Sequence, residues 1–152
     1  MESSGQKQNQ YGETSVNLMN QLGLLCYATT EDEPYMNDNQ LNHFQSYLNA
    51  WKNHLLSTSE LTAGQIQNDI TSIPDANDRA SYESTLGHLL HRNGRERKLV
   101  KRIEKSLIEI QNKNYGFCKS CQAHIGLKRL EARPIANECI DCKSLSEDAE
   151  KA

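Results

Sequence analysis

Four of the five cysteines form two Cys-x-x-Cys pairs, Cys118 with Cys121 and Cys139 with Cys142, and 17 residues lie between the pairs. Each pair directs two thiolates at one point, and two such pairs complete a tetrahedral shell around Zn²⁺. Four protein ligands leave no position for a catalytic water, so the spacing predicts one structural zinc ion. The alternative is a disulfide or a redox switch, although a redox Cys-x-x-Cys needs only one pair.

No other group of residues predicts catalysis. The sequence lacks a glycine loop that cradles phosphate and a recognisable Ser/His/Asp arrangement. His124 is a possible substitute ligand that four cysteines make unnecessary, and Cys26, on an apolar stretch, is expected to be a small buried residue. We therefore predict that the protein is not an enzyme.

The composition limits the core that carries this site. Hydrophobic residues make up 36% of the 152 residues and aromatic residues 6%, whereas an ordinary globular chain is about 45–50% apolar. We expect an elongated, mainly α-helical molecule with a small core. No apolar run approaches the roughly 20 residues of a membrane span. The N-terminus lacks the basic start and apolar block of a signal peptide, so we expect a cytoplasmic protein.

Two stretches carry the spacing of paired helices. The first seam of apolar residues, in steps of three and four, is Leu41, Phe44, Leu48, Trp51 and Leu55. The second is Tyr82, Leu86, Leu89, Asn93, Glu96, Val100, Ile103, Leu107 and Ile110. Pro74 lies between the stretches and ends a helix before it. The pattern predicts a long antiparallel helical hairpin, a coiled coil with arms of about 50 Å. Pairing between two chains is the alternative.

These elements divide the chain into four segments. We predict a disordered tail over residues 1–15 and an N-terminal segment, 16–34, that packs on the globular module. Within that segment, the apolar residues of 16–27 favour a short helix. The coiled-coil hairpin covers 35–112 and has its tip at 72–80. The four-cysteine zinc-finger module and a C-terminal helix cover 113–152.

Charge is distributed unevenly along the chain, whose formal net charge is −3. Residues 84–112 contain seven basic and three acidic side chains. The basic belt comprises Arg95, Arg97, Lys98, Lys101, Arg102 and Lys105. From the residues alone, the belt is interpreted as a solvated helix face. Either Asp75 or Asp78 is interpreted as the capping residue at the start of the second helix.

Six short motifs have a more specific meaning when they are taken with the cysteine pairs. They are Tyr35-Met-Asn, Ala50-Trp51, Pro74-Asp75-x-x-Asp78-Arg79-Ala80, Arg95-Glu-Arg-Lys-Leu99, Arg102-Ile-Glu-Lys105 and Arg129-Leu-Glu-Ala-Arg-Pro134. With these motifs, residues 35–145 resemble the DksA/TraR family of bacterial transcription regulators. The resemblance implies a protein that binds RNA polymerase, inserts its coiled coil into the secondary channel and keeps its zinc module at the rim. It also implies that the alarmone ppGpp binds at the shared interface.

The resemblance also assigns roles to individual positions. It places Asp75, Asp78 and Ala80 at the functional coil tip and makes Arg95 a polymerase contact. It places the ppGpp interface at Leu99, Arg102, Arg133 and Lys143. Position 102 departs from the family, which often has lysine there, and arginine favours a bidentate phosphate contact. The run His91-Arg92-Asn93-Gly94 departs as well, and the first 34 residues match no known pattern.

Two other functions stay open at this point. A zinc-ribbon protein would bind DNA or RNA through the basic belt, and a scaffold would use the coiled coil alone. The acidic tip, the net charge of −3 and the lack of aromatic stacking residues near the belt argue against direct nucleic-acid binding. A scaffold explains neither the tip nor the zinc site. We expect a monomer that binds RNA polymerase and neither DNA nor a membrane.

Overall fold

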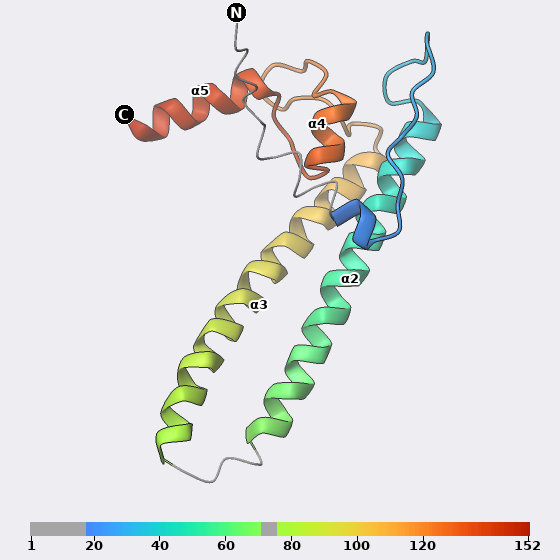
Figure 1. The fold of residues 1–152 in the computed structure, drawn as a ribbon. Helices are drawn as coiled ribbons and strands as arrows, with labels where there is room; N and C mark the ends of the chain where they lie inside the picture. The colour runs from blue at the N-terminus through green and yellow to red at the C-terminus, as the bar shows by residue number, and fades with distance from the viewer. Residues whose placement is uncertain (1–17, 71–75) are drawn as a thin grey trace, which may run out of the picture.

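The computed structural model describes residues 18–70 and 76–152. Two long helices, α2 (Asp38–Ile70) and α3 (Ala76–Gln111), are followed by the short helices α4 (Leu127–Ala132) and α5 (Ile140–Lys151) (Figure 1). Residues 18–21 are also helical, and an antiparallel bridge joins Phe117 to His124. None of the described helices is long and apolar enough to cross a bilayer. The predicted tail, 1–15, lies outside the described residues, and the other predicted segment boundaries stay predictions.

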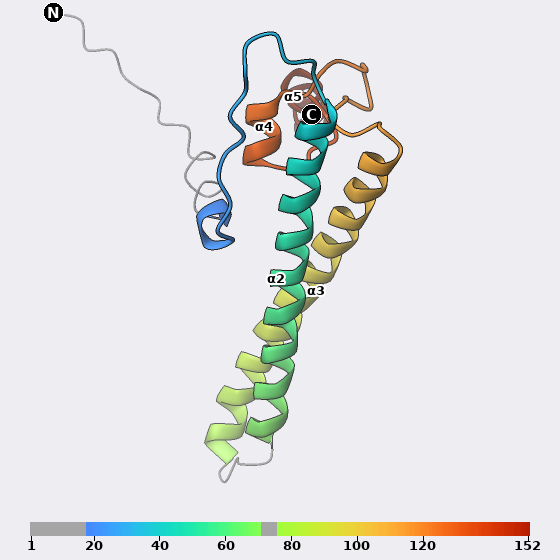
Figure 2. The ribbon, with the colours of Figure 1, turned by 90° about the vertical axis from the view of Figure 1, so that its right-hand side faces the viewer.

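Helices α2 and α3 lie side by side in opposite directions, as both views show (Figures 1 and 2). All nine residues of the predicted second seam are buried or half-buried, including the polar Asn93 and Glu96. Near the far end, the Tyr82 hydroxyl donates a 3.1 Å hydrogen bond to the carbonyl oxygen of Ile66 on the opposite helix. The predicted mainly α fold with a hairpin formed within one chain is therefore confirmed.

The core lies at one end of this hairpin. We call that end the base: residues 18–50 and 102–152. The remaining described residues, 51–70 and 76–101, form the distal arm. The buried apolar side chains are Met19, Leu41, Phe44, Tyr47, Leu48, Ile103, Ile110, Tyr115, Cys118, Ile125, Leu130 and Cys139. All belong to the base, and no side chain described in the distal arm is buried.

The residues just before α2, Tyr35 and Met36, connect the hairpin to the zinc-finger module. The Tyr35 hydroxyl donates to the Gly116 carbonyl at 2.7 Å and accepts from the Gly126 N–H at 3.0 Å. The Tyr35 ring stacks on His124, with 4.0 Å between the ring centroids. At Gly116, φ is +91° and a Cβ atom would lie 2.8 Å from the Met36 side chain, so only glycine fits.

The N-terminal segment packs across this base, but the prediction for one of its residues, Cys26, was wrong. The Tyr27 N–H donates a 2.6 Å hydrogen bond to the Glu131 carboxylate on α4, and Met19 is buried in the core. Cys26, however, is exposed, so the expectation that it is buried was wrong. The helix that its apolar neighbours predict ends at residue 21, and residues 24–30 are not helical. The helical face that would have turned Cys26 inward therefore does not form.

Candidate zinc centre and basic pocket

The four paired cysteines meet in one cluster. Among the described residues, these four cysteines form a group whose ligand atoms lie close enough together to hold a metal ion. Their Sγ atoms all lie within 4.8 Å of one another. The Cys121 and Cys139 sulfurs are 3.7 Å apart. Zn–S bonds of about 2.3 Å in a tetrahedron require sulfurs about 3.8 Å apart, so the spacing fits Zn²⁺. The predicted structural zinc is confirmed, and His124 is not part of the cluster.

Local backbone geometry produces this cluster. In the first pair, the Cys118 N–H donates to the Ala123 carbonyl at 2.8 Å and the Gln122 N–H donates to the Cys118 carbonyl at 2.9 Å. These bonds fold the first pair into a tight loop. In the second pair, Cys139 is the N-cap of α5, and its sulfur accepts from the Cys142 N–H at 3.5 Å. Each pair thus turns its two sulfurs to the same side.

The electrostatics of the cluster favour a cation at its centre. Backbone N–H groups of Cys139, Cys121 and Ser120 lower the pKa of the Cys118 thiol to about 6. Hydrogen bonding with the sulfurs of Cys139, Cys121 and Cys118 raises the pKa of the Cys142 thiol far above its usual range. The first thiol of the cluster, Cys118, therefore ionises readily, and ionisation of Cys142 beside it is unfavourable. A bound Zn²⁺ supplies the positive charge that lets all four ionise.

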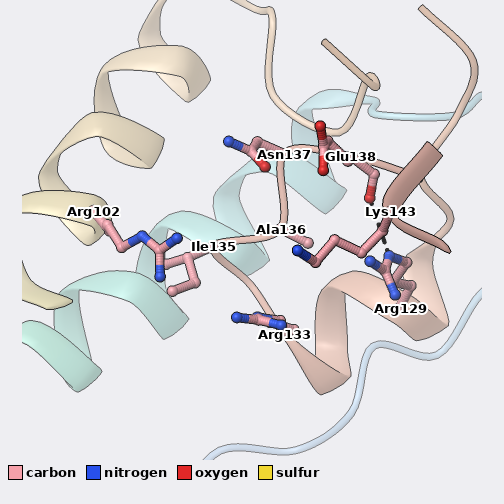
Figure 3. A pocket seen from close by; sticks show the side chains of 8 residues that line it. All are labelled: Arg102, Arg129, Arg133, Ile135, Ala136, Asn137, Glu138 and Lys143. Atoms are coloured by element: carbon pink, nitrogen blue, oxygen red, sulfur yellow. Dashed lines mark hydrogen bonds between the residues drawn. The ribbon is translucent and has the colours of Figure 1, made fainter. Parts of the chain in front are cut away.

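A basic pocket, shown in Figure 3, includes Glu138 and Lys143, the sequence neighbours of the cysteines Cys139 and Cys142. Its volume is about 190 Å³. It is lined by Arg102, Arg129, Arg133, Ile135, Ala136, Asn137, Glu138 and Lys143. Figure 3 shows Arg102 reaching it from α3, Arg129 and Arg133 from α4 and its end, and Lys143 from α5. The pocket therefore gathers cationic side chains from the hairpin helix α3 and from the zinc-finger module that follows it.

Three of these cations are ones for which the sequence predicted a ligand interface, namely Arg102, Arg133 and Lys143. The fourth member of that predicted set, Leu99, packs against the core and does not line the pocket. Sequence reasoning missed Arg129, which does line it. It precedes Arg133 by four residues, a spacing that favours neighbouring side chains where the chain is helical, and this was the available signal. Arg133 itself is the C-cap of α4, and its N–H donates to the Arg129 carbonyl.

The zinc centre and the core hold the walls of the pocket in place. Lys143 follows the ligand Cys142, and its N–H donates to the Cys139 carbonyl at 3.0 Å. On the other wall, the buried Tyr115 hydroxyl donates to the Pro134 carbonyl at 2.6 Å, next to Arg133. Loss of the metal would therefore release one wall of the pocket.

The remaining predicted site residues lie along the hairpin and away from the pocket. Asp78 and Ala80 are exposed near the start of α3, at the end opposite the base, and Arg95 is exposed on the distal arm (Figure 1). Asp75 lies outside the described residues. Asp78 stands inside the first turn of α3, where a negative charge is favourable because of the helix dipole.

A helical hairpin whose base carries a four-cysteine zinc centre defines the class of this protein: it is a coiled-coil protein with a C4 zinc finger. Residues 40–110 match the family model "DnaK suppressor protein DksA, N-terminal domain". Residues 113–148 match "Prokaryotic dksA/traR C4-type zinc finger". The chain belongs to the DksA/TraR family, as its motifs predicted.

Individual relatives agree with this assignment. The chain is 44% identical over 138 residues to the RNA polymerase-binding transcription factor DksA of Buchnera aphidicola, which covers 91% of each chain. It is 41% identical to the protein of that name from Haemophilus influenzae, over 90% of this chain and 94% of the relative. The solved structure of transcription factor DksA2 from Pseudomonas aeruginosa superimposes with a TM-score of 0.75 at 29% identity. That match covers 88% of this chain and 98% of the other.

Proposed function

We propose that this protein is a transcription regulator that binds RNA polymerase and modulates initiation together with ppGpp. The hairpin enters the secondary channel of the polymerase and the base stays at its rim. The observation that carries the proposal is the pocket in which Arg102, Arg133 and Lys143 converge at the base of a long hairpin. Relatives named RNA polymerase-binding transcription factors support it, at 41–44% identity.

The shape of the hairpin suits such a role. Helices of 33 and 36 residues reach about 50 Å at about 1.5 Å per residue, and a pair of helices is thin enough to enter a channel. The exposed Asp78 carboxylate lies at the end of the hairpin that enters the channel first. Arg95 lies partway along α3, where it can contact the rim. Asp75 and Ala80 belong to the same proposed tip. The protein would act in the cytoplasm as a monomer, without catalysis or direct DNA contact.

The basic pocket suits the ppGpp part of the proposal. Phosphate groups are bound by charge-assisted hydrogen bonds from arginine and lysine side chains, and the pocket presents these around one opening. Leu99 is half-buried and lies three residues before Arg102 on α3, so it would border the interface. Because the pocket is open at the surface, polymerase would complete it, so ppGpp should bind the complex far more tightly than the isolated protein.

Replacing Asp78 by Asn tests the tip. Asn keeps the side-chain size and removes only the charge. We expect near-normal unfolding and near-normal affinity for core polymerase, while regulation of a sensitive promoter falls sharply. Glu83→Gln is the matched control, because Glu83 is an exposed carboxylate further along α3, and it should regulate normally.

Three measurements on the same proteins decide the outcome: thermal unfolding, binding to core polymerase in the absence of DNA, and transcription in vitro. If Asp78→Asn regulates as well as Glu83→Gln, the only role of Asp78 is to stabilise the start of α3. If the unmodified protein binds DNA but not core polymerase, the proposal is wrong and the nucleic-acid alternative replaces it.

A further inference from the structure

The four cations of the basic pocket are not held equally. Arg102 and Arg133 are exposed, and in the described part of the chain neither forms an ion pair. The Lys143 ammonium lies 3.5 Å from the Glu147 carboxylate, one turn further along α5. That acid is a competitor for any anion that approaches Lys143. Arg129 differs from all three.

Arg129 is half-buried and tied to the opposite wall of the pocket. Its Nε–H donates a 3.1 Å hydrogen bond to the carbonyl oxygen of Glu138, drawn as a dashed line in Figure 3. Among the described acids, none forms an ion pair with its guanidinium. The charge is therefore not neutralised, and the orientation of the planar group is fixed before any ligand arrives.

A guanidinium held in this way is prepared for phosphate. Arginine has five N–H donors, and the bond to Glu138 uses the one on Nε. The four on the two Nη atoms remain, in the fork geometry that binds two phosphate oxygens at once. Because the orientation is already fixed, little side-chain entropy is lost on binding.

We propose that Arg129 is a further phosphate-binding residue of the basic pocket and gives a bidentate contact to one phosphate group of the ligand. The inference rests on the proposed binding of ppGpp to this pocket. It adds a residue to which the family resemblance gave no role, and it assigns the geometry of the contact.

The test is a titration of ppGpp into the full-length, zinc-loaded protein bound to core polymerase, with promoter-complex lifetime as the signal. Arg129→Lys keeps the charge and loses the fork, so the half-maximal ppGpp concentration should rise about tenfold, as expected for the loss of one charge-assisted bond. Arg129→Ala should raise it further. Lys128→Ala is the matched control, because Lys128 is the neighbouring exposed base on α4 and does not line the pocket. It should change the value less than twofold.

A purely structural role is tested on the same proteins. The bond from Arg129 to Glu138 lies next to the zinc ligand Cys139, so zinc content and thermal unfolding are measured for each variant. Arg129→Lys should keep both. If it loses zinc or unfolds early in proportion to its loss of ppGpp response, Arg129 supports the fold and the inference is wrong.

Arg102→Ala separates this inference from the proposal on which it rests. If Arg102→Ala weakens the ppGpp response while both Arg129 variants match Lys128→Ala, only the assignment of Arg129 fails. If Arg102→Ala has no effect either, the pocket is not the ppGpp site and both fail.

Discussion

The helices α2 and α3 run through both the base and the distal arm, yet different interactions hold the two regions together. In the base, Phe44, Leu48 and Ile103 are completely buried, and each such side chain contributes about 1.5–3 kcal/mol through burial. In the distal arm, Leu61 and Leu90 are 71% and 59% exposed. The arm is held by its narrow seam and by single contacts such as the bond from Tyr82 to Ile66.

Under the proposed function, this difference separates the region that stabilises the fold from the region that contacts the polymerase. The apolar residues of the base form a core that supports the zinc centre and the pocket. The arm leaves most of its residues exposed, which suits the proposed entry into the polymerase channel. Substitutions in the two regions should therefore have different consequences, and the following predictions test that separation from the largest effect to the smallest.

Loss of zinc should have the largest effect, and it should begin in the base. Structural zinc in small fingers contributes about 10–16 kcal/mol of apparent binding energy, comparable with the whole stability of a domain. Cys118→Ser should therefore unfold the module and disturb its docking on the hairpin. Metal analysis should give about one zinc per chain for the unmodified protein.

The exposed Cys26 provides the control for this prediction. Cys26→Ser removes a thiol outside the zinc centre and should change neither zinc content nor thermal unfolding. A metal-free protein that unfolds at the same temperature as the zinc-loaded one would contradict the assignment of a structural role.

A pair of leucine substitutions compares the two regions directly. Leu48→Ala in the base leaves a cavity and should lower the free energy of unfolding by about 2–5 kcal/mol. Leu90→Ala in the distal arm removes an exposed side chain and should change it by about 0.5 kcal/mol or less. Urea denaturation of the two variants measures both. Equal losses would mean that the arm has a core of its own.

Two glycine substitutions should have opposite signs. Gly116→Ala in the base places a Cβ atom 2.8 Å from the Met36 side chain at a φ of +91°, and the strain should cost about 1–3 kcal/mol. Gly87 lies within α3 with no atom near an added Cβ. Gly87→Ala should therefore stabilise the arm by about 0.5–1 kcal/mol. Hydrogen exchange of arm amides checks the second effect, and faster exchange in Gly87→Ala would refute it.

The smallest effect should be a pH dependence that arises in the base. Burial lowers the pKa of His43, and the nearby Glu131 carboxylate opposes the shift only in part. The neutral form is therefore favoured in the folded state, so this contribution to stability is complete above about pH 6.5, the value of an unperturbed histidine, and is lost as the pH falls below it. His43→Gln, measured with zinc in excess, should show a shallower loss of stability below that pH. Parallel curves would show that His43 does not contribute.

The parts of the molecule that were predictable are those encoded over short distances. The cysteine spacing predicted the zinc centre, and the steps of three and four residues predicted both helices, including the half-buried Asn93 and Glu96. Cys26 was misjudged because its apolar neighbours favour a helix and the chain leaves helical geometry at residue 21. Contacts with Glu131 and the core, rather than local propensity, determine the path there.

The basic pocket needed the three-dimensional structure. Its cations lie on α3, α4 and α5, and only the docking of the zinc-finger module on the hairpin brings them together. The family resemblance indicated Arg102, Arg133 and Lys143 but gave Arg129 no role, because the role proposed for it depends on a hydrogen bond to Glu138. The bridge made by Tyr35 was equally inaccessible to pattern analysis, since its two partners are backbone groups.

The long-range bonds of the base also determine the order in which the protein assembles. The hydrogen bonds that join Tyr35 with Gly116 and with Gly126 span 81 and 91 residues, and the one that joins Tyr27 with Glu131 spans 104. On the ribosome, α2 leaves the exit tunnel long before its partners exist, and the base closes only when nearly the whole chain has emerged. Contacts of such separation form slowly, whereas helical turns form at once. A chain interrupted after α3 would carry both helices of the hairpin, with the exposed Asp78 and the basic belt. It would lack the zinc centre and the core residues that follow α3, namely Tyr115, Cys118, Ile125, Leu130 and Cys139.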